Sequence, residues 1–457
     1  MTVVAPPPRR ELLTGAGIVG VALWAGLWRL DTTTILFDEP TYAQAGRDHV
    51  SGDRLLNLEH PPLAKYGFGL AQSLLGDGIT SARVVSALAG AVIAVLVWRL
   101  GTELFGRATG LTAAALWIAL PRSIGSDEAG TPGDRLERFA YLEPLTAMWM
   151  TLAIWFGWRL HRAGRRLDAV GLGLAVGAAT ASKVSGVFVA VPIGLFLLAV
   201  GGRRHVVALR IAAAVSATTF LATYAPFGRT ANEALDDMIR IQRDHAEAGH
   251  AVFVNGESTN HPPWYTELWY HLDADGPWLT AATVVLVALA VVAGRRLAGG
   301  YLLGVVVGLY LLLSLLPVEL RHYRFVVWPP LVVLMAAGIV AVAGPRPGRW
   351  RVVGAAATAV VVVVGALSLG RLATLEPEDY AALDAALDDR GVSAEAAVAV
   401  FGPHHVAAHH LPDRPVLPRN DPETVAAADV VLVDRTHTVR FGEPEVGPVG
   451  DTFTLGR

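Results

Sequence analysis

The chain has 457 residues, of which 53% are hydrophobic and 17% are charged, and its mean hydropathy is +0.45. Soluble domains carry about 25% charged residues, so this composition is typical of an integral membrane protein. The chain has no cysteine, which excludes disulfides, thiolate metal sites and a cysteine nucleophile. The formal net charge of −3 says little until it is divided between the two sides of the membrane.

The apolar segments predict an all-α membrane region over residues 1–375. A spanning helix needs roughly 20 mostly apolar residues. Arg9 and Arg10 precede the first span without a small-residue cleavage site after it, which predicts an uncleaved anchor. Polar residues at 182–186 divide one long apolar run into two crossings. The eleven predicted spans are 12–30, 81–98, 107–121, 139–158, 168–182, 184–200, 206–226, 278–294, 301–317, 325–343 and 352–371.

The distribution of arginine predicts the orientation. Short loops such as 159–166 and 203–210 are rich in arginine and poor in acids. Because cytoplasmic loops carry an excess of basic residues, these loops and the N-terminus are expected in the cytoplasm. Eleven spans then place the C-terminus outside the cell. The first outer loop, 31–80, and the long loop 227–277 lie on the same outer side of this predicted multi-pass cell-membrane protein.

Residues 376–457 differ from the rest of the chain because they are acidic and contain no long apolar run. A helix is expected at 377–390, and buried strands are expected at 396–401 and 429–433. The segment is therefore predicted to form a small extracytoplasmic α/β domain with an accessory or docking role.

The first outer loop begins with two adjacent acids, Asp38 and Glu39. Ionisable groups at a membrane surface are costly unless they have a use. One interpretation makes Asp38 a general base for a hydroxyl and Glu39 the group that orients it or binds a metal. The other gives both acids only a capping role, because Pro40 favours the start of a helix over Thr41–Val50.

The same loop continues with His60-Pro61-Pro62-Leu63-Ala64-Lys65. The prolines keep the backbone extended after His60 and can begin a second helix over Leu63–Leu75. His60 and Lys65 are then held in a defined relation to the acids and are candidates for shaping a site. The alternative is a proline turn with a lysine that extends along the membrane surface.

The outer surface is predicted to carry an unusual set of cations. Only two of the 37 basic residues are lysines, Lys65 and Lys183, and an ammonium is a compact charge suited to phosphate. The positive-inside rule does not explain arginines outside, so they indicate an external anion, with anchoring to lipid headgroups as the alternative. The arginines concerned are Arg83, Arg138, Arg321 and Arg324.

Two further residues are candidates for shaping the site or binding a divalent metal. Glu143 lies at the expected start of the fourth span, and His261 precedes an aromatic segment that could instead belong to the interfacial belt. No phosphate-binding glycine-rich loop is present, so nucleotide hydrolysis is not supported, and nucleic acid is not an expected partner.

Three motifs together carry a resemblance to a known family. Phe37-Asp38-Glu39, His60–Lys65 and Ser81–Gly90 resemble the protein O-mannosyltransferases and their bacterial relatives, within the type C glycosyltransferases that include the aminoarabinose transferases. The resemblance continues through Glu143-Pro144, Ser182-Lys183 and the 323–330 region. It implies the type C fold, with about eleven transmembrane helices and a polyprenyl-phosphate sugar as the donor.

By this resemblance Asp38 is the catalytic base, Glu39 is its partner and Arg83 contacts the lipid phosphate. Lys183, Arg321 and Arg324 are further candidates for binding that phosphate. The chain lacks the large luminal insert of eukaryotic members, and relatives also accept lipids and polysaccharides.

The sequence therefore predicts a glycosyltransferase that moves a sugar, with mannose expected, from polyprenyl monophosphate to an acceptor hydroxyl on the outer face. Three acceptors are left open: a protein Ser/Thr, as in protein O-glycosylation of the cell envelope, a glycolipid, or a polysaccharide. The sugar could instead be a pentose. The sequence identifies no cofactor with certainty, and a divalent metal stays open. A polytopic transporter, which would place ionisable groups near mid-membrane, and a non-catalytic envelope protein are the alternatives from other classes.

Overall fold

The computed structural model divides the chain into two units. The membrane unit comprises Met1–Leu30, Thr41–Gly125 and Pro132–Ala373, and the second unit comprises Asp31–Pro40, Ser126–Thr131 and Thr374–Arg457. The structure describes residues 9–32, 35–36, 38–54, 56–122, 135–249, 252–254, 257–293, 296–343, 348–375, 383–401, 407–408, 411, 413–417, 428–434 and 452–455.

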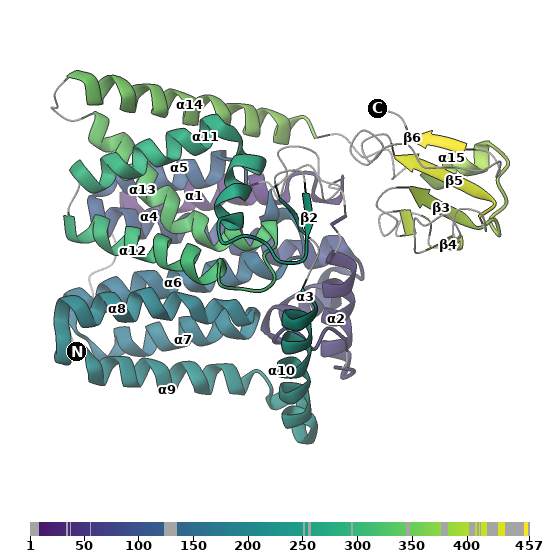
Figure 1. Ribbon diagram of the computed structural model, residues 1–457, viewed down its shortest axis with the longest axis horizontal. Helices are drawn as coiled ribbons and strands as arrows, with labels where there is room; N and C mark the ends of the chain where they lie inside the picture. The colour runs from purple at the N-terminus through teal and green to yellow at the C-terminus, as the bar shows by residue number, and fades with distance from the viewer. Residues whose placement is uncertain are drawn as a thin grey trace. The chain divides into compact units, whose positions relative to one another are not determined.

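Long apolar helices run side by side through the membrane unit (Figure 1). Among the described residues, seven helical segments are long and apolar enough to cross a membrane, and the predicted count of eleven crossings stays a prediction. The helices of the bundle are α1 (Arg9–Leu27), α4 (Ile79–Phe105), α5 (Arg107–Ala119), α6 (Leu142–Ala163), α7 (Arg166–Ser182), α8 (Ala190–Gly201), α9 (Val206–Ala222), α11 (Thr266–Ala293), α12 (Arg296–Leu313), α13 (Trp328–Val342) and α14 (Gly348–Ala373).

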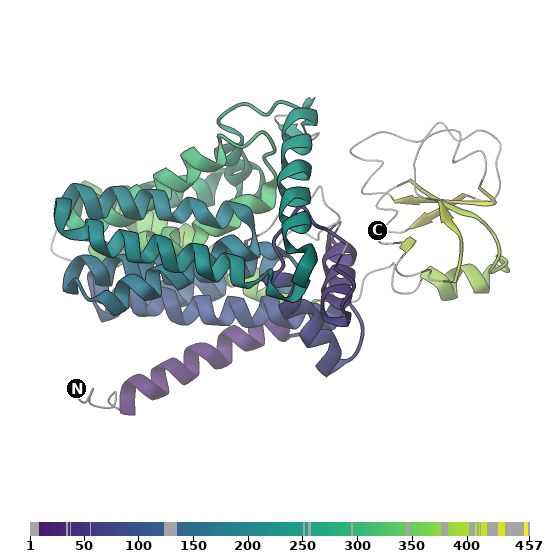
Figure 2. The same ribbon diagram turned by 90° about the horizontal axis from the view of Figure 1, so that it is seen from below.

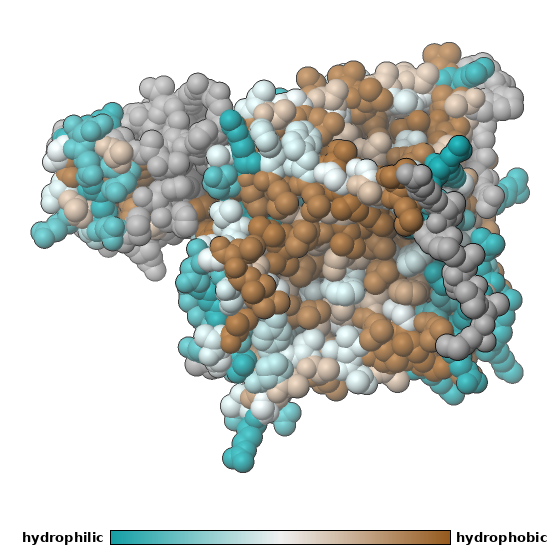
Figure 3. Space-filling view, turned by 180° about the vertical axis from the view of Figure 1, so that it is seen from behind, coloured by the Kyte–Doolittle hydropathy of each residue, from teal (hydrophilic) through white to brown (hydrophobic). Residues whose placement is uncertain are grey.

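The centre of the bundle is formed by α13, whose residues 328–338 are all buried. A helix that is apolar on every side is stable only when neighbours cover it all round. On the outside, α9 has one buried residue among those described, Ala212, so most of its surface is left for lipid. Figure 3 shows hydrophobic residues over the middle of the membrane unit and hydrophilic residues towards its edges.

Glycines let α7 and α9 approach each other closely. A Cβ atom added at Gly173 would lie 2.5 Å from the carbonyl oxygen of Ala212, and one added at Gly177 would lie 2.6 Å from that of Ser216. Small residues at such positions are the usual means of packing helices where the solvent is itself apolar.

Shorter helices gather at one end of the bundle (Figures 1 and 2). Helix α2 (Glu39–Ser51) has Pro40 in its first turn and ends before Gly52, whose φ is +106°. Helix α3 (Leu63–Leu75) follows Pro62 and ends at Gly76, with φ of +103°. The two helices predicted in the first outer loop are thus confirmed. The third short helix at this end is α10 (Ala231–Ala248).

Connections between helices contribute most of the polar residues at that end. They include the hairpin of β1 (Val252–Val254) and β2 (Glu257–Thr259), which pair antiparallel. Gly276, with φ of +79°, and Pro277 break α11 into a polar first part and an apolar second part. The 3-10 helices are η1 (Leu30–Thr32), η2 (Leu136–Arg138), η3 (Val184–Val189), η4 (Gly202–His205), η5 (Ala225–Thr230) and η6 (Arg321–Val327).

The second unit contains a parallel sheet in the order β4-β3-β5-β6. Strands form where two buried strands were predicted, and the described part of the predicted helix is α15. The extracytoplasmic position of this α/β segment stays a prediction. Its elements are α15 (Leu383–Asp389), β3 (Val398–Phe401), β4 (Val416–Leu417), β5 (Val430–Asp434) and β6 (Thr452–Leu455).

Candidate functional site

A buried ion pair joins α6 to the end of α7. Lys183 follows the last residue of α7 and is 4% exposed, and Glu143 lies in the first turn of α6 and is 1% exposed. The Nζ atom of Lys183 donates to Oε1 of Glu143. The α-helix ends at Ser182 because the backbone of Lys183 is extended, as the predicted break at 182–186 requires. The start of α6 also suits a carboxylate, because a helix N-terminus favours negative charge.

Residues of η6 cover this ion pair. His322 Nε2 lies 3.6 Å from Oε1 of Glu143. The Nζ atom of Lys183 lies 3.7 Å from the centre of the Tyr323 ring, within range of a cation–π interaction. The other carboxylate oxygen, Oε2 of Glu143, is buried and makes no hydrogen bond within the described part of the chain. One acceptor of the pair is therefore left for a ligand.

Aromatic rings extend this group towards α2. Tyr141 packs against His322 with ring centres 5.1 Å apart and against Tyr42 of α2 at 5.7 Å, and Tyr42 lies 5.9 Å from His60. These contacts bring four separate segments together at one end of the bundle. We call this group the Glu143–Lys183 cluster, and its members are Tyr42, His60, Tyr141, Glu143, Lys183, His322 and Tyr323.

Asp38 and Glu39 stand at the start of the helix that carries Tyr42. Asp38 is half-buried and directly precedes α2, one helical turn before Tyr42. Glu39 is fully buried, and its Oε2 accepts a hydrogen bond of 3.0 Å from the backbone N–H of Leu36. The amide of Glu39 in turn donates to the carbonyl of Leu36. Glu39 thus closes the turn that leads into Asp38.

Lys65 is fully buried and binds the loop before α3. Its Nζ atom donates to the carbonyl of His60 at 2.6 Å and also to that of Asn57. Burial lowers the pKa of Lys65 to about 7, and the nearby charge of Glu59 opposes this shift. Lys65 therefore holds His60 in place through its backbone.

His60 is uncharged at neutral pH. Burial is the main cause that lowers the pKa of His60 well below its usual value, and the positive charges of Lys183 and Lys65 lower it further. Its Nδ1 atom is buried and has no hydrogen-bond partner among the described residues. A neutral imidazole can accept or donate one hydrogen bond, so His60 can contact a hydroxyl or an oxyanion.

Two of the predicted outer arginines bind the end of α1 and the turn after it. Arg83 NH1 donates to the carbonyl of Leu30 at 3.0 Å, and its guanidinium lies 5.4 Å from the ring centre of Phe139. Arg138 donates to the carbonyls of Ala25, Gly26 and Arg29 at 3.0–3.3 Å. Both arginines thus satisfy carbonyl groups that a helix end leaves unpaired.

The other two arginines belong to η6 and pair with α11. Arg321 NH2 lies 2.9 Å from Oδ2 of Asp273. Arg324 NH1 lies 2.6 Å from Oδ2 of Asp275 and 3.3 Å from Nδ1 of His271. These ion pairs fix η6 against the polar part of α11 and thereby fix the positions of His322 and Tyr323.

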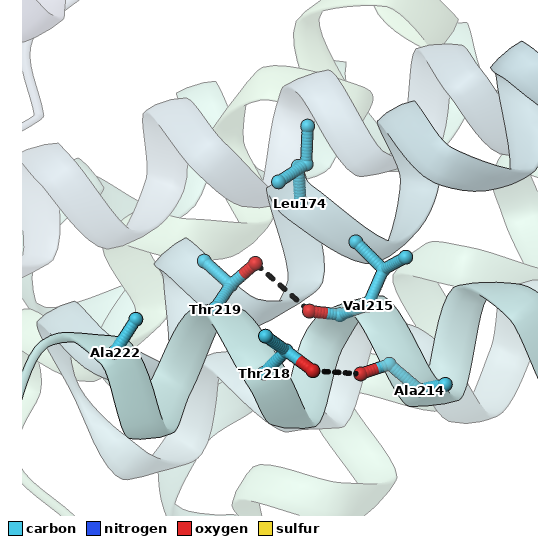
Figure 4. Close-up of a pocket in the computed structure, with 6 residues that line it drawn as sticks. All are labelled: Leu174, Ala214, Val215, Thr218, Thr219 and Ala222. Carbon is cyan, nitrogen blue, oxygen red and sulfur yellow. Dashed lines mark hydrogen bonds between the residues drawn. The ribbon is translucent and has the colours of Figure 1, made fainter.

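The two candidate metal ligands differ in their surroundings, since His261 is exposed and Glu143 is buried. Within the described residues no group of three or more His, Asp or Glu side chains could hold a metal ion. A separate hollow, lined by Leu174, Ala214, Val215, Thr218, Thr219 and Ala222, lies between α7 and α9 (Figure 4). The hydroxyls of Thr218 and Thr219 donate to carbonyls of their own helix, which leaves this hollow apolar.

Sequence reasoning missed two sets of buried polar residues. Glu267, His271 and Asp275 recur every four residues and share one face of α11. This spacing is visible in the sequence and ends just before the helix break at Gly276. The other set is Arg122, Arg135 and Glu137, in which both oxygens of Glu137 accept from Arg122. No local pattern indicated it, because the three residues belong to a connection between helices.

The chain is similar in sequence to one known family. The family described as dolichyl-phosphate-mannose-protein mannosyltransferase matches residues 59–228, which confirms the resemblance predicted from the sequence. No curated protein sequence matches the chain.

Two solved structures share the fold. ArnT from Cupriavidus metallidurans, bound to undecaprenyl phosphate, is 16% identical with a TM-score of 0.59, over 98% of this chain and 90% of ArnT. The oligosaccharyltransferase AglB from Archaeoglobus fulgidus, in complex with an inhibitory peptide and a dolichol-phosphate, is 12% identical with a TM-score of 0.54. That match covers 89% of this chain and 64% of AglB. The chain therefore has the polytopic fold of the type C glycosyltransferases, as predicted.

Proposed function

We propose that the protein is a membrane glycosyltransferase that transfers a sugar from a polyprenyl-monophosphate donor to an acceptor hydroxyl. The observation that carries the proposal is the Glu143–Lys183 cluster, in which a buried ammonium, a neutral imidazole and tyrosine rings come together at one end of the bundle. Fixed donors of this kind suit a phosphate whose charge grows during reaction. The family match and the shared fold support the same donor class.

The reaction follows from the charges. Asp38 accepts the proton of the acceptor hydroxyl while its oxygen forms a bond to the anomeric carbon. The bond from that carbon to the phosphate oxygen breaks, and the electron pair leaves with the polyprenyl phosphate. The leaving phosphate gains a second negative charge, which Lys183 offsets, with Arg83, Arg321 and Arg324 as the other candidate ligands. One such preorganised donor is worth about 3–4 kcal/mol in the transition state.

Glu39 and Glu143 have supporting roles in this proposal. Glu39 holds the turn before Asp38 through the amide of Leu36 and so positions the base. Glu143 orients Lys183. His60 lies close enough to contact the substrates, and Lys65 and Arg138 act through the backbone that they bind.

The identities of the sugar and of the acceptor are also part of the proposal. Mannose is the expected sugar because the matching family is described by a mannose donor. The acceptor is a hydroxyl of a protein Ser/Thr, a glycolipid or a polysaccharide on the outer face, which is the side where the arginine distribution places the cluster.

The test is transfer of labelled mannose from polyprenyl phosphate by the purified protein in lipid nanodiscs, with peptide, glycolipid and polysaccharide acceptors offered separately. Loss of a general base costs about 10²–10⁴-fold in rate, so we expect Asp38→Asn to lose activity on that scale. Asp31→Asn, an exposed aspartate of the same segment, is the matched control and should keep it. Transfer by Asp38→Asn within threefold of the unmodified protein would remove Asp38 as the base. Substrate uptake into vesicles without transfer would favour a transporter.

A further inference from the structure

A second buried carboxylate lies at the start of α11. Glu267 is 0% exposed, and neither of its carboxylate oxygens has a hydrogen-bond partner among the described residues. A buried carboxylate without donors is costly, and buried polar groups are normally satisfied. The side chain is therefore expected to have a partner other than the described residues.

The surrounding charges do not supply it. The charges that act on Glu267 are those of Glu319, Arg324 and Lys183. Both cations already have a carboxylate, since Lys183 donates to Glu143 and Arg324 lies 2.6 Å from Asp275. Glu319 is 1% exposed and also has an unpartnered oxygen, Oε2. Burial raises the pKa of Glu319 to about 7.

The backbone that carries Glu267 is held on both sides. Thr266 Oγ1 donates to the carbonyl of Pro263 at 2.6 Å, and the Tyr270 hydroxyl donates to the carbonyl of Glu319 at 3.0 Å. The guanidinium of Arg321 lies 5.5 Å from the Tyr270 ring centre. The first turn of α11 is thus fixed against the segment before η6, so the position of the Glu267 backbone is fixed.

The chemistry of the two carboxyl groups, Glu267 and Glu319, limits which ligand can bind between them and the cluster's phosphate. An anion such as phosphate is repelled by two carboxylates. A divalent cation needs more oxygen or nitrogen ligands than two carboxylates give, and no three such side chains converge in the described residues. A neutral group with several donors satisfies the carboxylate oxygens without adding charge, and adjacent hydroxyls on a sugar ring are such a group.

We propose that Glu267 binds hydroxyl groups of the donor sugar and determines which sugar is accepted. This inference rests on the proposed function, because it needs a sugar carried by a phosphate near Lys183. Helix η6 connects the two sites. The ring centre of Tyr323 lies 3.7 Å from Nζ of Lys183, and the guanidinium of Arg321 lies 5.5 Å from the ring centre of Tyr270, three residues after Glu267. The phosphate then lies at Lys183 and the sugar extends towards Glu267.

The experiment compares three ligands: polyprenyl-phosphate mannose, its monodeoxy analogues and polyprenyl phosphate without sugar. Binding and transfer are measured for the unmodified protein, for Glu267→Gln and for Glu247→Gln, an exposed glutamate of α10 given the same chemical change. Leaving a buried hydrogen-bonding group without its partner costs about 1–3 kcal/mol, so we expect Glu267→Gln to weaken binding of the mannose donor about 5- to 100-fold. Binding of polyprenyl phosphate alone should stay within twofold, and Glu247→Gln should match the unmodified protein throughout.

The deoxy donors give the decisive comparison. At least one of them should bind the unmodified protein more weakly than the full donor, and that penalty should disappear in Glu267→Gln, because the hydroxyl and the carboxylate are partners. Glu267→Gln should also unfold at a similar or a higher temperature, since it replaces an unsatisfied buried carboxyl group by a neutral amide of the same shape.

Two results overturn the inference while leaving the proposed function intact: equal weakening of sugar-bearing and sugar-free lipid, or deoxy penalties that persist unchanged in Glu267→Gln. Failure of the proposed function looks different. The unmodified protein would then transfer sugar from no polyprenyl-phosphate donor and bind none of them more tightly than the bare lipid.

Discussion

Two buried ionic groups in the membrane unit contain similar residues and differ in what they leave unsatisfied. In the Glu143–Lys183 cluster, Oε2 of Glu143 makes no hydrogen bond to the described residues. In the group of Arg122, Arg135 and Glu137, both oxygens of Glu137 are occupied by Arg122. The remaining donors of Arg122 bind the carbonyls of Trp117 and Leu120 at the end of α5, and Arg135 binds that of Ile118.

The difference shows that burial of charge does not by itself mark a functional site. A planar guanidinium has donors enough to satisfy several carbonyls at a helix end, as Arg122 and Arg138 do. In the arginine group both carboxylate oxygens are occupied, and the buried atom left without a partner among the described residues is a donor, Nε of Arg135. Lys183 and His322 come from breaks between helices, and their side chains lie against the carboxylate of Glu143. Free acceptors and rings are then left to face a substrate.

The largest expected effect tests the Glu143–Lys183 cluster. Lys183→Met removes the proposed phosphate ligand and leaves Glu143 as an unpaired buried charge. We expect about 10²–10³-fold slower transfer and about 3–5 kcal/mol lower stability. The double variant Lys183→Met/Glu143→Gln should regain stability but not activity, as measured by thermal unfolding and sugar transfer on the same sample. Recovery of activity in the double variant would show that Lys183 has only a structural role.

Changes in the group of Arg122, Arg135 and Glu137 should lower stability without lowering the rate of transfer. Arg122→Met strands Glu137 and should also cost about 3–5 kcal/mol of stability. Transfer per folded molecule should change less than threefold, and Arg122→Met/Glu137→Met should restore the unfolding temperature. A rate loss of more than tenfold in the stable double variant would place this group in the site and remove the distinction between the two.

Arg138 tests whether an outer arginine serves the helix end. Arg138→Gln removes charged hydrogen bonds to the carbonyls of Ala25, Gly26 and Arg29, with an expected loss of about 1.5–3 kcal/mol in unfolding free energy. Arg138→Lys keeps the charge but not the fork, so it should recover part of that loss. A lowered affinity for polyprenyl phosphate at unchanged stability would instead indicate contact with the lipid phosphate.

The smallest effect, measured per pH unit, concerns Lys65. Its pKa is lowered to about 7 in the folded protein, against an ordinary value near 10.5 in the unfolded chain. The unfolded state therefore binds more protons between pH 7 and 10.5, and stability should rise with pH in that window by up to about 1.4 kcal/mol per unit. Thermal unfolding of Lys65→Met should lose this slope. An equal slope in both proteins would show that other groups cause it.

Several features of the candidate site were predictable from the sequence. Proline and glycine set the limits of α2 and α3, and the polar run at 182–186 predicted the break that presents Lys183. Other features were not predictable. The carbonyls bound by Arg138 lie more than a hundred residues away in sequence, and the unsatisfied oxygens of Glu267 follow from its neighbours rather than from its own segment.

The sequence by itself determined that the chain is a helical membrane protein with the fold of the type C glycosyltransferases, because apolar run length, arginine bias and short motifs are local properties. Only the tertiary structure decided which buried charges are complete and which still need a ligand. A hydrogen bond depends on the distance and direction between two particular atoms, and for residues far apart in the chain those are set by how the helices pack.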